Sequence, residues 1–170
     1  MHFTLDLKLS ASMIVKDTPE RIKINASEAV CSALAERFGY LGVNSLKGQI
    51  EVRLISASCW QLKGFFVAEI LQACVVSGEA VADNFEFELL ERYLEAPENS
   101  KAKIHEEIDP MGVDVEMLEN GMIPVGEAVA QACAVHAASW PRHPDAPILA
   151  PLEEVKEENR PFAKLSELKK

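Results

Sequence analysis

The sequence predicts an α+β domain with a mostly antiparallel sheet that is strongly twisted or partly closed like a barrel. Three observations predict this class. Several segments alternate apolar and polar residues, two others have helical spacing, and short turn signals connect them. Strands and helices do not alternate regularly enough for parallel βαβ units, and no glycine-rich phosphate loop follows a strand. We therefore expect two main helices against the sheet and a short helix in the C-terminal tail.

Five segments have the pattern of strands. Residues 3–9, 21–24 and 49–54 alternate apolar and polar side chains, so each should bury one face. Residues 64–73 are apolar on both faces, which favours a central strand that is covered on both sides. A Ser-Gly turn then leads to alternating residues 84–89, which predicts a hairpin with the preceding strand.

Two segments have helical periodicity. The first begins at Asn25, a favourable N-cap with a glutamate three residues later, and ends at Gly39. The second follows Gly121, with apolar residues on one face from Val125 to Ala138, and stops at Trp140-Pro141. These signals predict one helix in each half of the chain.

The chain of 170 residues, 48% of them hydrophobic, suits one domain that buries its own core. We expect this α+β domain to span residues 1–140. Five of the nine prolines lie between positions 141 and 161, and this density favours extended chain. Residues 141–160 are therefore predicted to be a proline-rich linker, and residues 161–170 a C-terminal docking segment.

The docking segment begins with a proline suited to a first helical position, and apolar residues recur every three positions after it. A helix this short is marginal without packing, so its apolar side needs a surface on this domain or on a partner. Packing against its own domain and binding to a partner both remain open at this stage. The predicted docking residues are Arg160, Pro161, Phe162, Leu165 and Leu168.

The net charge of -10 is concentrated in one block. Residues 79–119 hold 13 acidic and 3 basic side chains, and the rest of the chain is balanced. Such a block repels phosphate backbones, so we expect any nucleic-acid role to be indirect. The block is either a solvated face or a docking surface for a basic protein. Its predicted contact residues are Glu86, Glu88, Glu91, Glu106 and Glu107. Direct RNA binding around Arg37, Arg53 and Lys63 is the less favoured alternative.

The four cysteines are scattered without a Cys-x-x-Cys pair, and the amino terminus lacks the pattern of an export signal. We therefore expect a reducing, cytoplasmic environment. No segment approaches the roughly 20 apolar residues of a membrane span, so no membrane contact is expected.

Cys74 is the candidate nucleophile, since it ends a hydrophobic strand at a turn. Nearby carboxylates would raise the pKa of its thiol, which favours a buried structural cysteine over a catalytic one. Ser77 stands where a second thiolate would complete a zinc knuckle, and the histidines show no ligand spacing around it. We expect no metal, no cofactor and no small-molecule substrate. A cysteine- or metal-dependent enzyme centred on Cys74 is the alternative.

Three segments resemble one known family: Gln72-Ala-Cys-Val-Val-Ser-Gly-Glu-Ala-Val81, then Ile123-Pro-Val-Gly-Glu127 with its helix and Trp-Pro-Arg142, then Arg-Pro-Phe-Ala-Lys-Leu-Ser-Glu-Leu-Lys169. Their order and spacing are similar to those of the YceD family, the large ribosomal RNA subunit accumulation proteins, especially the alphaproteobacterial type. The resemblance implies a non-enzymatic factor that supports synthesis, processing or stability of large-subunit (23S) ribosomal RNA. Together with the charge pattern, it implies a ribosomal or ribosome-assembly protein as partner, with any contact to precursor ribosomal RNA indirect.

The chain departs from the family pattern at two positions. Many relatives carry Cys-x-x-Cys at the central turn, whereas this chain has Cys74 and Ser77, which makes a shared zinc site doubtful. Pro124 stands where relatives commonly have an aspartate that would cap the following helix. We therefore expect that helix to be capped by another group.

Overall fold

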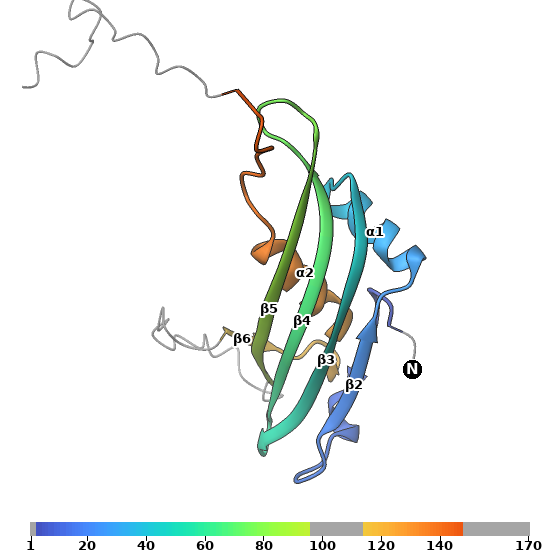
Figure 1. Ribbon diagram of the computed structural model, residues 1–170. Helices are drawn as coiled ribbons and strands as arrows, with labels where there is room; N and C mark the ends of the chain where they lie inside the picture. The colour runs from blue at the N-terminus through green and yellow to red at the C-terminus, as the bar shows by residue number, and fades with distance from the viewer. Residues whose placement is uncertain (1–2, 96–113, 148–170) are drawn as a thin grey trace, which may run out of the picture.

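The computed structural model describes residues 3–95 and 114–147 (Figure 1). In chain order the elements are β1 (Leu9–Ser10), the 3₁₀ helix η1 (Ala11–Met13), β2 (Glu20–Asn25), α1 (Glu28–Phe38), β3 (Gly42–Ser56), β4 (Cys59–Ala73), β5 (Ala80–Leu94), β6 (Asp114–Met117), β7 (Met122–Ile123) and α2 (Val125–His136). Within these residues, no helix has both the length and the apolar character needed to cross a membrane.

The strands form a five-stranded sheet in the order β2-β3-β4-β5-β6 and a small sheet that pairs β1 with β7. All pairs are antiparallel except β5 with β6. The predicted α+β class, the mostly antiparallel sheet and the two helices are therefore confirmed. The described strands form no closed barrel, because β2 and β6 are free edges. Partial closure is not confirmed, and the predicted tail helix lies outside the described residues.

Both helices lie on one side of the sheet, behind the long strands in the view of Figure 1. The strand predicted over residues 64–73 is central, as expected, but only one of its faces is covered. Phe66 is fully buried on the helix side, whereas Phe65 and Val67 are 43% and 39% exposed on the other side. The prediction of two covered faces was wrong for the described residues, because both helices they contain lie on the other side of the sheet (Figure 1).

The ring of Phe66 fills the centre of the core. It stacks on Phe87 with ring centroids 5.0 Å apart. A Cβ atom at Gly48 would lie 2.4 Å from the Phe66 ring, and one at Gly64 would lie 2.6 Å from it. The two glycines therefore make room for the ring, which lets β3 and β4 pair closely around it.

The N-terminal segment is not the strand predicted over residues 3–9; only Leu9 belongs to a strand. Its main chain instead packs across the start of α2. The amide of Gly126 donates to the carbonyl of Leu7 at 2.9 Å, and a Cβ at Gly126 would lie 2.3 Å from the carbonyl oxygen of Leu5. This contact satisfies one free amide of a helix whose N-cap, Pro124, offers no side-chain cap. It is the alternative cap that the sequence left unidentified.

Helix α1 begins two residues later than predicted. Asn25 is the last residue of β2, and Ser27 caps the helix by accepting from the Val30 amide at 3.4 Å. Asn25 belongs to β2 rather than to the helix because the pairing of β2 with β3 continues through Asn25. Gly39 ends the helix in the left-handed region, with φ of 70°, as predicted.

Candidate functional site

The turn between β4 and β5 forms one end of the molecule. The amide of Cys74 donates to the carbonyl of Glu79 at 2.7 Å, and the amide of Gly78 donates to the carbonyl of Cys74 at 2.9 Å. Gly78 has φ of 76°, which a glycine adopts without strain. The predicted Ser-Gly hairpin turn is therefore confirmed, and it holds Cys74 at the end of β4.

The sulfur of Cys74 accepts three main-chain hydrogen bonds. The amides of Val76 and Ser77 each lie 3.4 Å from Sγ, and the amide of His143 lies 3.3 Å from it. These donors, the His143 amide foremost and then the Ser77 hydroxyl and amide, lower the pKa of the Cys74 thiol to about 6. We had expected nearby carboxylates to raise this pKa. That expectation was wrong because donated hydrogen bonds, which favour the thiolate, dominate at this turn.

The chain after α2 lies against the same turn. The amide of Val75 donates to the carbonyl of Pro141 at 2.9 Å. Asp83 of β5 accepts from the amide of Ala138 at 2.8 Å and from the side chain of Gln72 at 3.1 Å. The first residues of the predicted linker thus contact the domain, whereas residues 148–160 lie outside the described part of the chain. Residues 72–81 and the segment after α2 therefore meet here in space.

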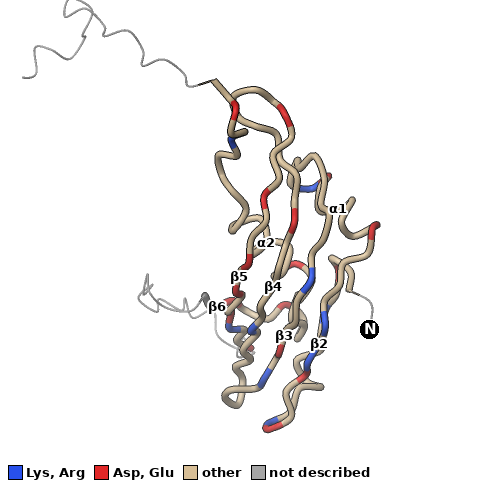
Figure 2. The backbone as a smooth tube through the Cα atoms, viewed as in Figure 1, with Lys and Arg blue, Asp and Glu red and all other residues tan. Residues whose placement is uncertain are grey.

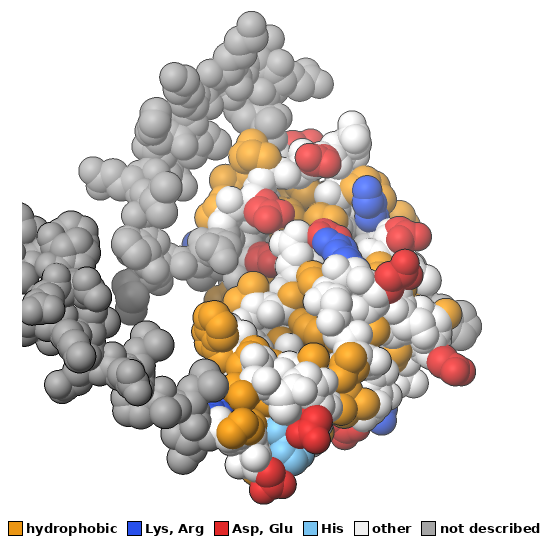
Figure 3. Space-filling model, turned by 90° about the horizontal axis from the view of Figure 1, so that it is seen from above, with side chains coloured by type: hydrophobic (Ala, Val, Ile, Leu, Met, Phe, Trp, Pro, Cys, Tyr) orange, Lys and Arg blue, Asp and Glu red, His pale blue; other side chains and the backbone are white. Residues whose placement is uncertain are grey.

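Large apolar side chains are exposed next to this contact. Trp140 is 81% exposed, directly before the proline that bonds to the turn, and Val75 within the turn is 54% exposed. Viewed from above, this end shows hydrophobic side chains in patches among acidic ones (Figure 3). We call Trp140, Val75, Glu79 and Asp145 the tip surface. Periodicity marked Trp140-Pro141 as a helix stop but did not predict the exposure of the tryptophan, since local pattern does not tell an exposed tryptophan from a buried one.

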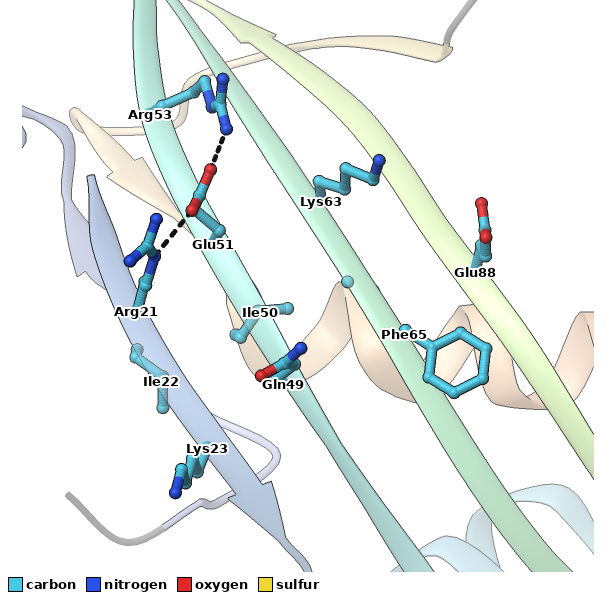
Figure 4. Close-up of a pocket in the computed structure, with 11 residues that line it drawn as sticks. Arg21, Ile22, Lys23, Gln49, Ile50, Glu51, Arg53, Lys63, Phe65 and Glu88 are labelled. Carbon is cyan, nitrogen blue, oxygen red and sulfur yellow. Dashed lines mark hydrogen bonds and ion pairs between the residues drawn. The ribbon is translucent and has the colours of Figure 1, made fainter. Parts of the chain in front are cut away.

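The open face of the sheet carries a second feature, a groove of about 590 Å³. Its walls come from β2, β3, β4 and β5, and its labelled side chains are shown in Figure 4. Basic residues lie along β2 and β3, and acidic residues lie along β5 (Figure 2). The guanidinium groups of Arg21 and Arg53 both pair with Glu51, which lowers the pKa of that carboxyl, chiefly through the Arg21 hydrogen bond.

The predicted acidic face is divided between two sides of the sheet. Glu86 and Glu88 are exposed on the open face, as predicted. Glu91 is half-buried and accepts from the Tyr93 hydroxyl at 2.5 Å, so it belongs to a buried contact. The strand period explains the division, because odd and even positions of β5 face opposite sides. Glu106 and Glu107 lie outside the described residues.

The other predicted site residues lie in the C-terminal tail and at the central turn. The tail residues Arg160, Pro161, Phe162, Leu165 and Leu168 all lie outside residues 3–95 and 114–147. Within those ranges, no group of three or more histidine, cysteine or acidic side chains could hold a metal ion. At the central turn, Ser77 donates a hydrogen bond to the sulfur of Cys74 rather than supplying a second thiolate. The resulting arrangement can stabilise a thiolate with main-chain amides, and it joins two distant segments.

Comparison of the chain with protein-family models, with curated proteins and with solved structures gave no match.

Proposed function

We propose that this protein is a non-enzymatic factor of ribosome biogenesis that supports synthesis, processing or stability of large-subunit ribosomal RNA in the cytoplasm. It acts by binding a ribosomal or ribosome-assembly protein. One observation carries the proposal. The hairpin turn at Cys74 and the segment around Trp140-Pro141, two of the stretches similar to the YceD family, are joined by hydrogen bonds into the tip surface.

The tip surface has the chemistry of a docking site for a basic protein. An exposed tryptophan beside an exposed valine offers apolar contact area, and the indole face also attracts a lysine or arginine. Glu79 and Asp145, in the same two segments, are exposed and supply two negative charges against the one positive charge of the exposed Arg142. Ribosomal proteins that contact RNA are rich in basic residues, so opposite charge would steer the encounter and make it sensitive to salt.

Sedimentation with large-subunit precursors in an extract of the source cells tests the proposal. The wild-type chain should sediment with the precursors at low salt and less at high salt. Trp140→Ala should lose this association. Met13→Ala is the matched control, because Met13 is 82% exposed in η1 and lies outside the tip surface. Absence of the wild-type chain from precursor fractions, or equal association of both variants, would contradict the proposal.

A second candidate function is a reaction that depends on Cys74, and the lowered pKa of its thiol favours it. The two functions differ in the behaviour of this sulfur. As a structural thiolate, Cys74, which is 3% exposed, should resist iodoacetamide in the native protein and react after unfolding. Native alkylation of Cys74 faster than that of a free thiol would instead favour the enzyme.

A further inference from the structure

We propose that the groove on the open face of the sheet binds single-stranded RNA directly, with lysine and arginine side chains on the phosphates and Phe65 stacked on a base. The choice of RNA rests on the proposed function. The site itself is separate from the tip surface and rests on different residues. It therefore adds a direct RNA contact to a protein whose net charge alone disfavours one.

The basic side of the open face has a surplus of positive charge. Five cations point outward from β2, β3 and β4: Arg21, Lys23, Lys47, Arg53 and Lys63. Two carboxylates point outward from the same strands, Glu69 of β4 and Glu51, which is shared by Arg21 and Arg53, so the surplus is three positive charges. Among the described residues, the three lysines form no ion pair. Their ammonium groups are therefore available to phosphate oxygens.

The strand register sets these cations in rows around Phe65. Arg21, Glu51 and Lys63 are opposite one another on three neighbouring strands, and Lys23, Gln49 and Phe65 form the next row. Neighbouring rows on one face are about 7 Å apart, twice the rise per residue of a strand. The groove residues of both rows are visible in Figure 4. A nucleotide chain laid across them meets a cation on each side of an exposed aromatic ring.

Phe65 identifies the class of occupant. Its side chain is 43% exposed on the β5 side of the groove, between Gln49 of β3 and Glu88 of β5 (Figure 4). Sequence-tolerant binding of single-stranded nucleic acid combines a cationic track with aromatic side chains that stack on bases. A paired duplex does not offer its base faces for such stacking, and an acidic peptide without aromatic side chains has no group to stack on the ring.

The acidic strand beside the groove sets the position of the RNA. Glu86 and Glu88 are exposed on β5, opposite Val67 and Phe65 of β4. Their charges repel phosphates, so the backbone is confined to the cations of β2 and β3 and to Lys63 of β4. The distribution of charge along the sequence does not show this pairing of a basic and an acidic side, because the two sets of residues come together only when the strands pair.

Fluorescence anisotropy with a short labelled oligouridylate and the full-length protein tests the inference. The wild-type chain should bind the single strand, with an affinity that falls as salt rises. The double variant Lys23→Glu/Lys63→Glu should weaken binding by about tenfold or more and flatten the slope of log K against log salt by about 1.4, since each single-strand phosphate contact contributes about 0.7. Phe65→Leu should weaken binding by about fivefold or more through lost stacking.

Lys8→Glu is the matched control, because it makes the same charge change at a lysine that lines a different depression with Glu116 and Glu119. It should bind the oligonucleotide nearly as well as the wild type. Glu88→Gln should bind more tightly, since it removes a repelling charge. Thermal melting of each variant checks that the fold is kept, and Lys23→Gln/Lys63→Gln repeats the test without reversed charge.

No measurable binding, or equal weakening by Lys8→Glu and by the groove variants, would overturn the inference. An acidic peptide that displaces the oligonucleotide at equal concentration would also overturn it. The two proposals fail separately. Sedimentation with precursors without oligonucleotide binding removes only the RNA site, and oligonucleotide binding without sedimentation removes only the ribosomal function.

Discussion

The amide of His143 donates a hydrogen bond to the sulfur of Cys74, 3.3 Å away, across a sequence separation of 69 residues. This bond fixes the chain after α2 against the hairpin between β4 and β5. It is also the largest cause of the lowered pKa of the Cys74 thiol. Ionisation of one cysteine is thereby linked to the contact that presents Trp140.

This link predicts a pH dependence of stability. The pKa of the Cys74 thiol is lowered from 9.0 in the unfolded chain to about 6 in the folded one, so the folded state favours the thiolate. The resulting stabilisation is complete above about pH 9 and is lost as pH falls towards 6. The free energy of unfolding of wild type minus that of Cys74→Ser should therefore grow between pH 6 and pH 9, as measured in urea.

Cys133→Ser is the control for this titration. Burial raises the pKa of the Cys133 thiol to about 11, so its contribution to stability should stay constant from pH 6 to about pH 8 and fall only as pH rises past about 9, opposite to the rise expected for Cys74. In addition, ultraviolet thiolate absorbance should show one cysteine ionising near pH 6, and Cys74→Ser should remove this step. A flat stability difference across the window would contradict the assignment of a thiolate to Cys74.

The ion pair between the two helices gives a second prediction. Arg37 of α1 donates to both carboxylate oxygens of Glu127 in α2, at 2.7 and 2.6 Å. The Arg37 hydrogen bond is the chief cause that lowers the pKa of Glu127 to about 2. Since both side chains are more than a third exposed, a double-mutant cycle with Arg37→Met and Glu127→Gln should give a coupling of about 1 kcal/mol or less.

The pH dependence of this pair has the same sign as that of the Cys74 thiol but lies in a lower pH range. A depressed carboxyl pKa stabilises the fold fully above about pH 4.5, and the stabilisation is lost as pH falls towards 2. The coupling should therefore disappear in acid and weaken in high salt. A coupling that persists at pH 2 would show that packing of the side chains, rather than charge, joins the helices.

Packing in the core predicts that alanine substitutions at two glycines of β3 differ in their effect on stability. A methyl group at Gly48 would lie 2.4 Å from both the Phe65 carbonyl oxygen and the Phe66 ring. Gly48→Ala should therefore destabilise the protein by about 2 kcal/mol or more. Gly42→Ala meets only Leu71, at 3.8 Å, and should be nearly neutral. Urea unfolding of the two variants measures the difference, and equal stability would refute the close packing of Phe66.

Local sequence pattern predicted the class of fold because apolar period and turn chemistry act within one element. The hairpin at Gly78 and the end of α1 at Gly39 follow from such signals. The pattern failed where an element depends on contacts with residues far away in the sequence. Residues 3–7 alternate like a strand, yet their carbonyls cover the start of α2 at Gly126.

The candidate sites were predicted less well for the same reason. The pKa of the Cys74 thiol depends on the amide of His143, which local spacing does not place beside it. The predicted acidic face failed to separate Glu88 from Glu91, because only the strand geometry shows that they point to opposite sides of the sheet. The basic groove draws its cations from three strands, so no cluster of lysine and arginine marks it along the chain. Resemblance to a family indicated Cys74 and Trp140-Pro141, but their contact appears only in the fold.

The central claim is that the tip surface binds a component of large-subunit precursors. The most direct measurement places a photoreactive phenylalanine analogue at position 140, where the side chain is 81% exposed, and maps its crosslinks in cell extract. This change should leave stability within about 0.5 kcal/mol of wild type. We expect crosslinks to a basic protein of large-subunit precursors, and these should be absent when the analogue is placed at position 13. Crosslinks confined to proteins outside the ribosome, or no crosslinks from a folded chain, would contradict the account.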